Sequence, residues 1–101
     1  MIGVLIPAYN AEPTVGRAAS GAIRHADRVL VVDDGSRDRT SAIAAGAGAE
    51  VIRHAVNRGK GAALATGFAR LLGEGAEAVV TIDADLQHEP DDIPSLLETY
   101  R

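Results

Sequence analysis

Two aspartates separated by one residue, Asp83 and Asp85, are the side chains whose type and spacing most directly suggest chemistry. They follow residues 79–82, an apolar and β-branched run of the kind that forms a strand buried on both faces. Alternate side chains of an extended segment point to the same side, so both carboxylates can converge beyond the strand. Converging carboxylates repel each other unless a cation lies between them, and Mg²⁺ and Mn²⁺ prefer oxygen ligands. The spacing thus predicts a divalent-cation site, although aspartates at strand ends also serve simply to start turns.

The composition of the chain excludes several classes of function. Its 101 residues suffice for one small domain, and its net charge of −4, without a long basic run, argues against binding to a nucleic-acid backbone. An acidic protein that handles phosphates needs a metal ion. The absence of cysteine excludes disulfides and thiolate metal sites. No apolar run approaches the roughly 18 residues of a membrane span, and no signal peptide precedes the first strand, so we expect a cytoplasmic domain.

Apolar runs alternate with segments of helical periodicity along the whole chain. Pro7 is expected to end the first strand, because proline cannot donate a hydrogen bond to a neighbouring strand. The rules for parallel crossovers then predict an α/β fold, an open and mainly parallel four-stranded sheet with helices on both faces. The strands are expected at residues 2–6, 28–33, 50–53 and 79–82, and a last helix is expected to begin near residue 91.

Capping residues and periodicity predict the limits and the buried faces of the helices. Asn10 is a suitable N-cap for the first helix, and Asp38 is a suitable N-cap for the second. The third helix is expected to end at Gly73 or Gly75. Helical spacing predicts inward-facing side chains at Val15, Ala18, Ala19, Ala22, Ile23 and Ala26 in the first helix and at Leu64, Phe68, Leu71 and Leu72 in the third.

Each predicted strand is followed by a polar segment that could carry chemistry. These segments read PAYN, DDGSRDRT, NRGKG and DADLQH in chain order. Open parallel sheets bind ligands beyond the carboxyl ends of their strands, near the point where the strand order reverses. The sequence therefore predicts one ligand site, built from four loops at one rim of the sheet.

Other phosphate-binding and catalytic patterns fit the chain poorly. A dinucleotide-binding turn needs G-x-G-x-x-G after the first strand, where this chain has PAYNAE. A phosphate-binding P-loop would need Gly in place of His54 and Ser or Thr in place of Gly61. No G-x-S-x-G nucleophile motif occurs. His25 and His54 are expected at the surface, and His88, near Asp85, is expected to be solvated rather than a metal ligand.

The four segments together resemble the motifs of a known enzyme family. IPAYN, VVDDGSRDRT, NRGKGAALATGF and IDADLQHEPDDIP resemble, in this order, the N-terminal nucleotide-sugar-binding half of family 2 glycosyltransferases of the GT-A fold. Within that family the chain is most similar to dolichyl- and polyprenyl-phosphate sugar synthases. Each motif alone is weak, but four in order over nearly the whole chain are specific. The resemblance implies that the sheet is the Rossmann-like half of a GT-A fold.

The resemblance also implies roles for individual residues. Asp83, Asp85 and Gln87 match the positions that hold Mg²⁺ or Mn²⁺ against the diphosphate of the donor. Asp34 matches a carboxylate that accepts a hydrogen bond from a base N–H. One departure from the family is Ala11, where relatives usually have Glu, and Glu12 could replace it only if the helix started differently. The implied donor-binding residues are Pro7, Tyr9, Val32, Asp34, Lys60, Asp83, Ala84 and Asp85, whereas Asp33, Gly35, Asp38 and Thr40 are expected to shape the turn and cap the second helix.

The function implied by the resemblance is metal-dependent transfer of a sugar, with inversion, from a UDP- or GDP-linked donor. The acceptor would be a lipid phosphate, such as polyprenyl or dolichyl phosphate, or a hydroxyl, which would bring the full-length parent to the cytoplasmic face of the membrane. Residues 1–101 are expected to be a single donor domain, truncated before the acceptor half. Alone, this domain is expected to be inactive in transfer and to carry no catalytic residue beyond the metal site. The alternative is a non-catalytic nucleotide-binding or interaction module.

The predicted truncation has a structural corollary at the fourth strand. In the family's sheet this strand is interior, so without the acceptor half one of its edges would be bare. A bare apolar edge invites pairing with another chain. We therefore expect homo-oligomers to form through this edge.

Overall fold

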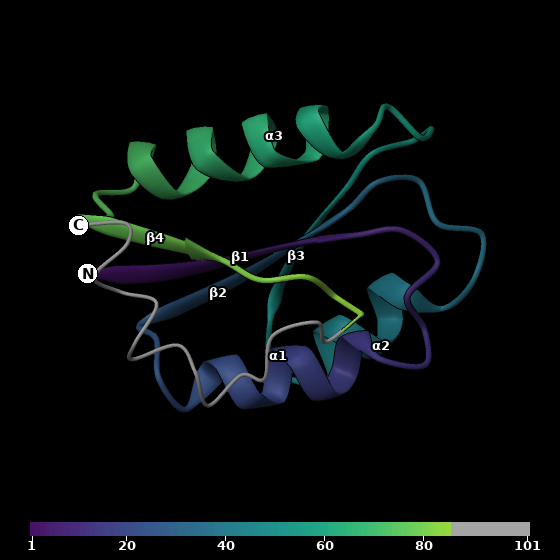
Figure 1. Ribbon diagram of the computed structural model, residues 1–101, viewed down its shortest axis with the longest axis horizontal. Helices are drawn as coiled ribbons and strands as arrows, with labels where there is room; N and C mark the ends of the chain where they lie inside the picture. Colours follow the sequence, from purple (N-terminus) through teal and green to yellow (C-terminus); the bar gives the residue numbers. More distant parts are fainter. Residues whose placement is uncertain (86–101) are drawn as a thin grey trace.

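The computed structural model describes residues 1–85, which form a four-stranded parallel sheet between two layers of helices (Figure 1). The order of the strands is β3-β2-β1-β4, and all three neighbouring pairs are parallel. This arrangement confirms the predicted open α/β sheet. The strands are β1 (Ile2–Ala8), β2 (Arg28–Asp33), β3 (Glu50–Arg53) and β4 (Ala78–Thr81), and the helices are α1 (Val15–Ile23), α2 (Thr40–Gly46) and α3 (Lys60–Gly73). The helix expected near residue 91 lies outside the described residues.

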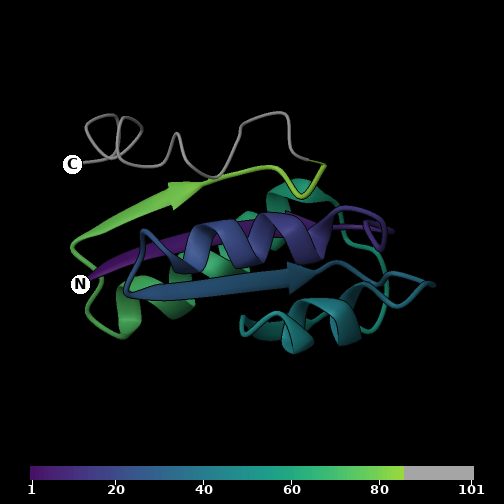
Figure 2. The same ribbon diagram turned by 90° about the horizontal axis from the view of Figure 1, so that it is seen from below.

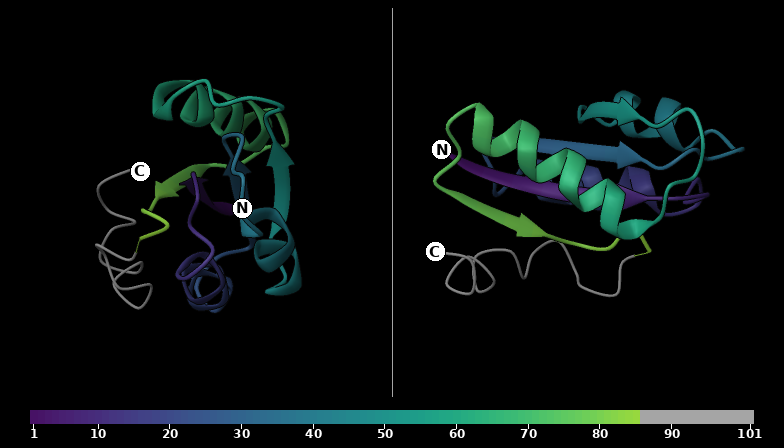
Figure 3. Two further views of the ribbon diagram at one scale, coloured as in Figure 1. Left: turned by 90° about the vertical axis from the view of Figure 1, so that its right-hand side faces the viewer. Right: turned by 90° about the horizontal axis from the view of Figure 1, so that it is seen from above.

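The helices cover the two faces of the sheet unequally. Figure 2 shows α1 and α2 in front of the strands, and α3 crosses the opposite face over β1 and β2 (Figure 3). From β1 the chain adds β2 and β3 on one side and then returns to add β4 on the other. The strand order therefore reverses between β1 and β4. In sheets of this kind that is the place where a ligand cavity forms at the carboxyl ends.

Strand β1 carries the centre of both hydrophobic cores. Val4 and Ile6 are completely buried on the face covered by α1 and α2, whereas Leu5 is completely buried on the face covered by α3. Successive side chains of a strand point to opposite faces, so a strand between two helix layers needs apolar residues at every position. This explains why β1 reads as one apolar run.

Strand β1 continues past the predicted end to Ala8, with Pro7 paired in register with Val32 of β2. The Leu5 carbonyl accepts a hydrogen bond from the N–H of Ile82, 3.1 Å away, on the β4 side. Pro7 lies two residues further on and faces that same side, beyond the last residue of β4. Its missing N–H therefore costs no strand hydrogen bond, and the strand can continue.

The helices differ from the prediction in the residue at which the first helix begins and in which side chains are buried. The first helix begins at Val15, and Asn10 is not its cap: Asn10 has a positive φ of 49°, and its side-chain oxygen accepts a hydrogen bond from the Arg37 N–H. Ile23 and Leu72 were expected in the core, but they are 40% and 57% exposed. Both follow a fully buried residue directly, and the 100° turn between neighbours in a helix carries them out of a narrow buried stripe.

Close packing of α3 on the sheet depends on a glycine. Gly67 is buried, and a Cβ placed on it would lie 2.1 Å from Cδ1 of Leu5. Leu5 is itself 0% exposed, so its side chain has no free space into which to move. The axis of α3 can approach β1 this closely only because residue 67 has no side chain.

Strand β4 pairs with β1 along one side. Within residues 1–85 no further strand pairs with its other side. Self-association through this edge stays a prediction.

The packing of α3 predicts that Gly67→Ala destabilises the fold. We expect the free energy of unfolding to fall by about 1–3 kcal/mol, because the added methyl overpacks the contact with Leu5. The measurement is urea denaturation followed by circular dichroism. The matched control is Gly61→Ala in the same helix, where a Cβ would meet nothing within 4 Å. Equal stabilities of the two variants would contradict the packing role of Gly67.

Candidate functional site

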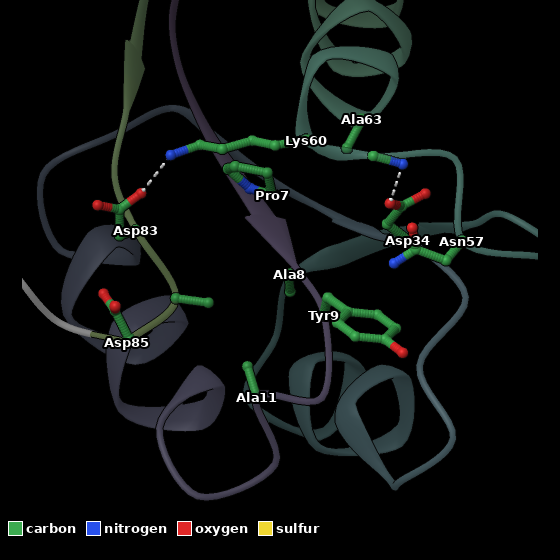
Figure 4. Close-up of a pocket in the computed structure, with 12 residues that line it drawn as sticks. Pro7, Ala8, Tyr9, Ala11, Asp34, Asn57, Lys60, Ala63, Asp83 and Asp85 are labelled. Carbon is green, nitrogen blue, oxygen red and sulfur yellow. Dashed lines mark hydrogen bonds and ion pairs between the residues drawn. The ribbon is translucent and has the colours of Figure 1, made fainter.

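A cavity of about 450 Å³ opens at the rim where the strand order reverses (Figure 4). Its volume lies in the range typical of small-molecule sites. The loops after β1, β2, β3 and β4 all contribute to it, as the sequence predicted. The residues that line it are Pro7, Ala8, Tyr9, Ala11, Asp34, Asn57, Gly59, Lys60, Ala63, Asp83, Ala84 and Asp85.

All but one of the predicted donor-binding residues lie around this cavity. Val32 is completely buried beneath α3, where it packs in the core with Ala63, and does not line the cavity. Gln87, which was predicted as a metal ligand, lies outside the described residues. The structure brings the others together: Pro7, Tyr9, Asp34, Lys60, Asp83, Ala84 and Asp85.

Sequence reasoning missed Asn57 as a lining residue. It stands in the NRGKG segment, whose place after a strand was the available signal. Its backbone N would lie 2.5 Å from a Cβ on Gly35, which has a positive φ of 78°. The loop after β3 is therefore packed directly against the turn after β2, and only glycine fits at position 35.

The acidic wall of the cavity carries Asp83 and Asp85, which follow β4. Asp83 Oδ1 accepts a hydrogen bond from Lys60 Nζ at 3.1 Å. Within residues 1–85 no group of three or more His, Cys, Asp or Glu side chains could hold a metal ion. Two carboxylates beside an open cavity nevertheless suit a hard cation whose remaining ligands are phosphate oxygens and water. The chemistry of the pair therefore fits Mg²⁺ or Mn²⁺ together with a phosphate-bearing ligand.

Asp34 lies on the opposite wall and accepts three hydrogen bonds. Its Oδ1 lies 2.7 Å from His54 Nδ1 and 2.9 Å from the Arg58 N, and its Oδ2 lies 2.7 Å from the Gly59 N. Burial of this carboxylate opposes ionisation, but the hydrogen bonds from His54, Arg58 and Gly59 outweigh it and lower the pKa of Asp34. The carboxylate is therefore ionised at neutral pH.

His54 is buried, which corrects the expectation that it lies at the surface. It is only 8% exposed, and its ring also lies 2.9 Å from Thr66 Oγ1 through Nε2. The ring thus joins Asp34 to α3. A polar residue directly after a short strand gave no signal of this burial, because both partners lie more than ten residues away in sequence.

Buried side chains hold the loop after β1 against the loop after β2. The Asn10 N–H donates to Ser36 Oγ at 2.8 Å, and the Ala11 N–H donates to Thr40 Oγ1 at 2.9 Å. Asp38 accepts hydrogen bonds from the N–H and the hydroxyl of Thr40 at the start of α2. The pKa of Asp38 is lowered, chiefly by the hydroxyl of Thr40.

Two further carboxylates contact the segment between β2 and α2. Asp33 Oδ1 accepts from the Ser36 N–H at 2.9 Å, which agrees with its expected role in shaping the turn. Glu12 Oε1 accepts from the Arg39 N–H at 2.8 Å, so this side chain is directed to the start of α2. Glu12 does not line the cavity, whereas Ala11 does. In this structure Glu12 therefore does not take the place expected of a Glu at position 11.

Comparisons with known proteins agree with this geometry. The model of the family described as Glycosyl transferase family 2 matches residues 3–101. An uncharacterized protein of Methanocaldococcus jannaschii is 41% identical over 98% of this chain and 43% of its own length. An undecaprenyl-phosphate 4-deoxy-4-formamido-L-arabinose transferase of Pseudomonas paraeruginosa is 38% identical over 97% of this chain and 32% of its own length. The chain thus spans less than half of these relatives.

A solved structure is similar over nearly the whole chain. Glucosyl-3-phosphoglycerate synthase from Mycobacterium tuberculosis superposes with a TM-score of 0.76 and 30% identity, over 93% of this chain and 37% of the synthase. That crystal structure contains Mn²⁺, uridine diphosphate and glucosyl-3-phosphoglycerate. Another crystal structure of the synthase contains Mg²⁺ and uridine diphosphate. No helix within residues 1–85 of the present chain has the length and apolar character needed to cross a membrane.

The contacts of Asp34 predict a pH-dependent contribution to stability. Because the folded-state pKa is lowered, the ionised carboxylate stabilises the fold above its ordinary value of 3.8, and this contribution is lost as pH falls through the folded-state pKa. Asp34→Asn, which leaves backbone N–H groups without a charged acceptor, should cost about 1–3 kcal/mol at neutral pH. The gap in unfolding free energy between wild type and variant should narrow below about pH 4. Urea denaturation across this pH range tests it, and a constant gap would refute it.

Proposed function

The chain belongs to glycosyl transferase family 2, and on that premise we propose that its cavity is the donor site of a metal-dependent inverting glycosyltransferase. The observation that carries the proposal is the arrangement of three carboxylates around one cavity. Asp34, a buried hydrogen-bond acceptor suited to a nucleobase, lies on one wall, and Asp83 and Asp85 lie on the opposite wall. A nucleoside diphosphate has a base at one end and a diphosphate at the other. The proposed ligand is therefore a nucleoside-diphosphate sugar.

The base and ribose would lie against Tyr9, Pro7 and Asp34. The Tyr9 side chain lines the cavity and is 49% exposed, so its ring offers an aromatic face to a ligand. Asp34 Oδ2 accepts one hydrogen bond within the protein and can accept another from a base N–H. Uridine diphosphate in the similar synthase supports a UDP-linked donor.

The diphosphate would lie between Lys60 and the pair Asp83 and Asp85. These carboxylates would hold Mg²⁺ or Mn²⁺, and the ion would stabilise the negative charge that develops on the leaving diphosphate. Lys60 already lies within reach of Asp83, and its 65% exposed side chain can turn to a phosphate oxygen. Gln87 is proposed as a further ligand of the ion, from the resemblance alone.

The acceptor is proposed to be a lipid phosphate of the polyprenyl type. The sugar would be transferred to it with inversion at the anomeric carbon. The undecaprenyl-phosphate transferase among the relatives supports this class of acceptor. Such an acceptor lies in a membrane, which would bring the enzyme to the membrane face. Because this chain spans only 32% of that relative, the acceptor site is proposed to lie in the part of such enzymes that the chain does not span.

Nucleotide binding tests the proposal directly. We expect isothermal titration calorimetry to show binding of UDP to the 101-residue chain in the presence of Mn²⁺ and its loss when EDTA removes the ion. Asp83→Asn and Asp85→Asn should each weaken this binding by about tenfold or more, because each removes a charged ligand of the cation. Glu77→Gln, an exposed carboxylate at the other end of the sheet, is the control and should bind as wild type does. Absence of UDP and GDP binding under every condition would favour the non-catalytic scaffold.

The ion pair between Lys60 and Asp83 gives a second prediction, in which one substitution changes the affinities for two ligands in opposite directions. Lys60→Met should raise the affinity for Mn²⁺ alone by about two- to tenfold, because Asp83 loses a competing cation. The same variant should weaken binding of UDP with Mn²⁺, because a phosphate contact is lost. Arg70→Met, which removes an equal charge near the far end of α3, is the control. A Lys60→Met variant that changes both affinities in the same direction would refute this role.

A further inference from the structure

We propose that His54 is a positioning residue. By donating a hydrogen bond to one carboxylate oxygen of Asp34, it leaves that oxygen no acceptor position for a ligand, and the site thereby selects uracil over guanine. This inference rests on the proposed donor-binding function and names the base that the site accepts. His54 does not line the cavity, so it would act on the base only through Asp34.

The hydrogen bonds of His54 determine where its proton lies. Asp34 is ionised and can only accept, so the ring nitrogen 2.7 Å from it, Nδ1, carries the hydrogen. In the neutral ring Nε2 is then an acceptor, and it receives the hydroxyl hydrogen of Thr66 at 2.9 Å. The side chains of His54 and Asp34 are only 7% and 4% exposed. The ring is therefore held from both sides, by β2 through Asp34 and by α3 through Thr66.

The acceptor positions of the Asp34 carboxylate can be counted. Each carboxylate oxygen accepts about two hydrogen bonds. Oδ1 already accepts two, from His54 Nδ1 and from the Arg58 N–H, whereas Oδ2 accepts one, from the Gly59 N–H. One acceptor position thus remains, and it is on Oδ2.

The carboxylate cannot easily turn to offer a different edge. All three of its donors lie in the segment from His54 to Gly59. That segment is packed onto the turn after Asp34, because the Asn57 N would lie 2.5 Å from a Cβ on Gly35. Rotation of the carboxylate would break hydrogen bonds on both of its oxygens. The remaining position on Oδ2 is therefore fixed in space.

One fixed acceptor position suits one base better than the other. Uracil presents a single N–H between two carbonyl groups. Guanine presents an N–H and an adjacent amino group, and a carboxylate satisfies both only when each of its oxygens accepts one hydrogen bond. With Oδ1 filled, the amino group of guanine would lie against Asp34 without an acceptor on that side chain, which costs binding free energy.

The neighbouring amide does not provide the same discrimination. Asn57 lines the cavity next to the turn that carries Asp34, and its NH₂ group can donate to a carbonyl of uracil or of guanine (Figure 4). Both bases can use that contact equally. Selection therefore depends on the occupied Oδ1 and on the His54 ring that occupies it.

The test is the ratio of GDP to UDP dissociation constants, measured by calorimetry on the 101-residue chain with Mn²⁺. Wild type should bind UDP tighter by about tenfold or more. His54→Phe keeps an aromatic ring but removes the donor to Oδ1, so the ratio should fall by about tenfold, through weaker UDP and stronger GDP binding. His54→Asn restores an N–H near the position of Nδ1 and should recover most of the ratio. Thr66→Val removes only the hydrogen bond to Nε2 and should lower the ratio about two- to fivefold.

The outcomes separate this inference from the proposed function. If wild type binds neither nucleotide, both fail. If wild type binds UDP but binds GDP equally well, or if the ratio is unchanged in His54→Phe, only this inference fails. A purely structural role of His54 would weaken both nucleotides together and leave the ratio constant. If circular dichroism shows that His54→Phe is unfolded, Thr66→Val decides the question, and an unchanged ratio in that variant overturns the inference.

Discussion

The buried carboxylate of Asp34 is the interaction on which the architecture of the cavity depends. It lies directly after β2 and accepts hydrogen bonds from His54, Arg58 and Gly59, which all come from the loop after β3. A buried charge is tolerated only where donors replace the water that it has lost. The loop after β3 is therefore a required partner of Asp34, and α3 begins where this loop ends. The position of α3 over the sheet and the shape of the cavity follow from that pairing.

A second set of hydrogen bonds, made by buried hydroxyl side chains, supports the loop after β1. Ser36 and Thr40, after β2, accept from the backbone of Asn10 and Ala11, after β1. The segment after β2 thus holds the loop after β3 through the carboxylate of Asp34, and it holds the loop after β1 through the hydroxyl groups of Ser36 and Thr40. Small residues then let the helices approach the sheet, as Gly67 does against Leu5. A chain with few aromatic residues gains its packing from proximity rather than from large side chains.

The features that could be predicted from sequence are those with a local cause. Periodicity and turn residues predicted four strands, three of the helices and the rim at which the polar loops meet, because each depends on neighbouring residues. The burial of His54 could not be predicted, since it depends on Asp34 and Thr66, which are distant in sequence. Asn10 failed as a helix cap for the same reason, because the backbone of Arg37 takes its side-chain oxygen. Val32 was expected at the donor site, but the position of α3 over β2 places it in the core.

The passage of β1 through Pro7 limits how far β1 can pair with β4. Beyond Leu5 and Ile82, the register would make the Ile82 carbonyl the next acceptor for β1, and residue 7 is the one that would have to donate to it. Proline has no hydrogen to give. Strands β1 and β4 therefore stop pairing at this point, and Asp83 and Asp85 line the cavity beyond it. A single proline ring thus fixes the residue at which the hydrogen bonding between β1 and β4 ends, and the site lies where the sheet cannot be extended.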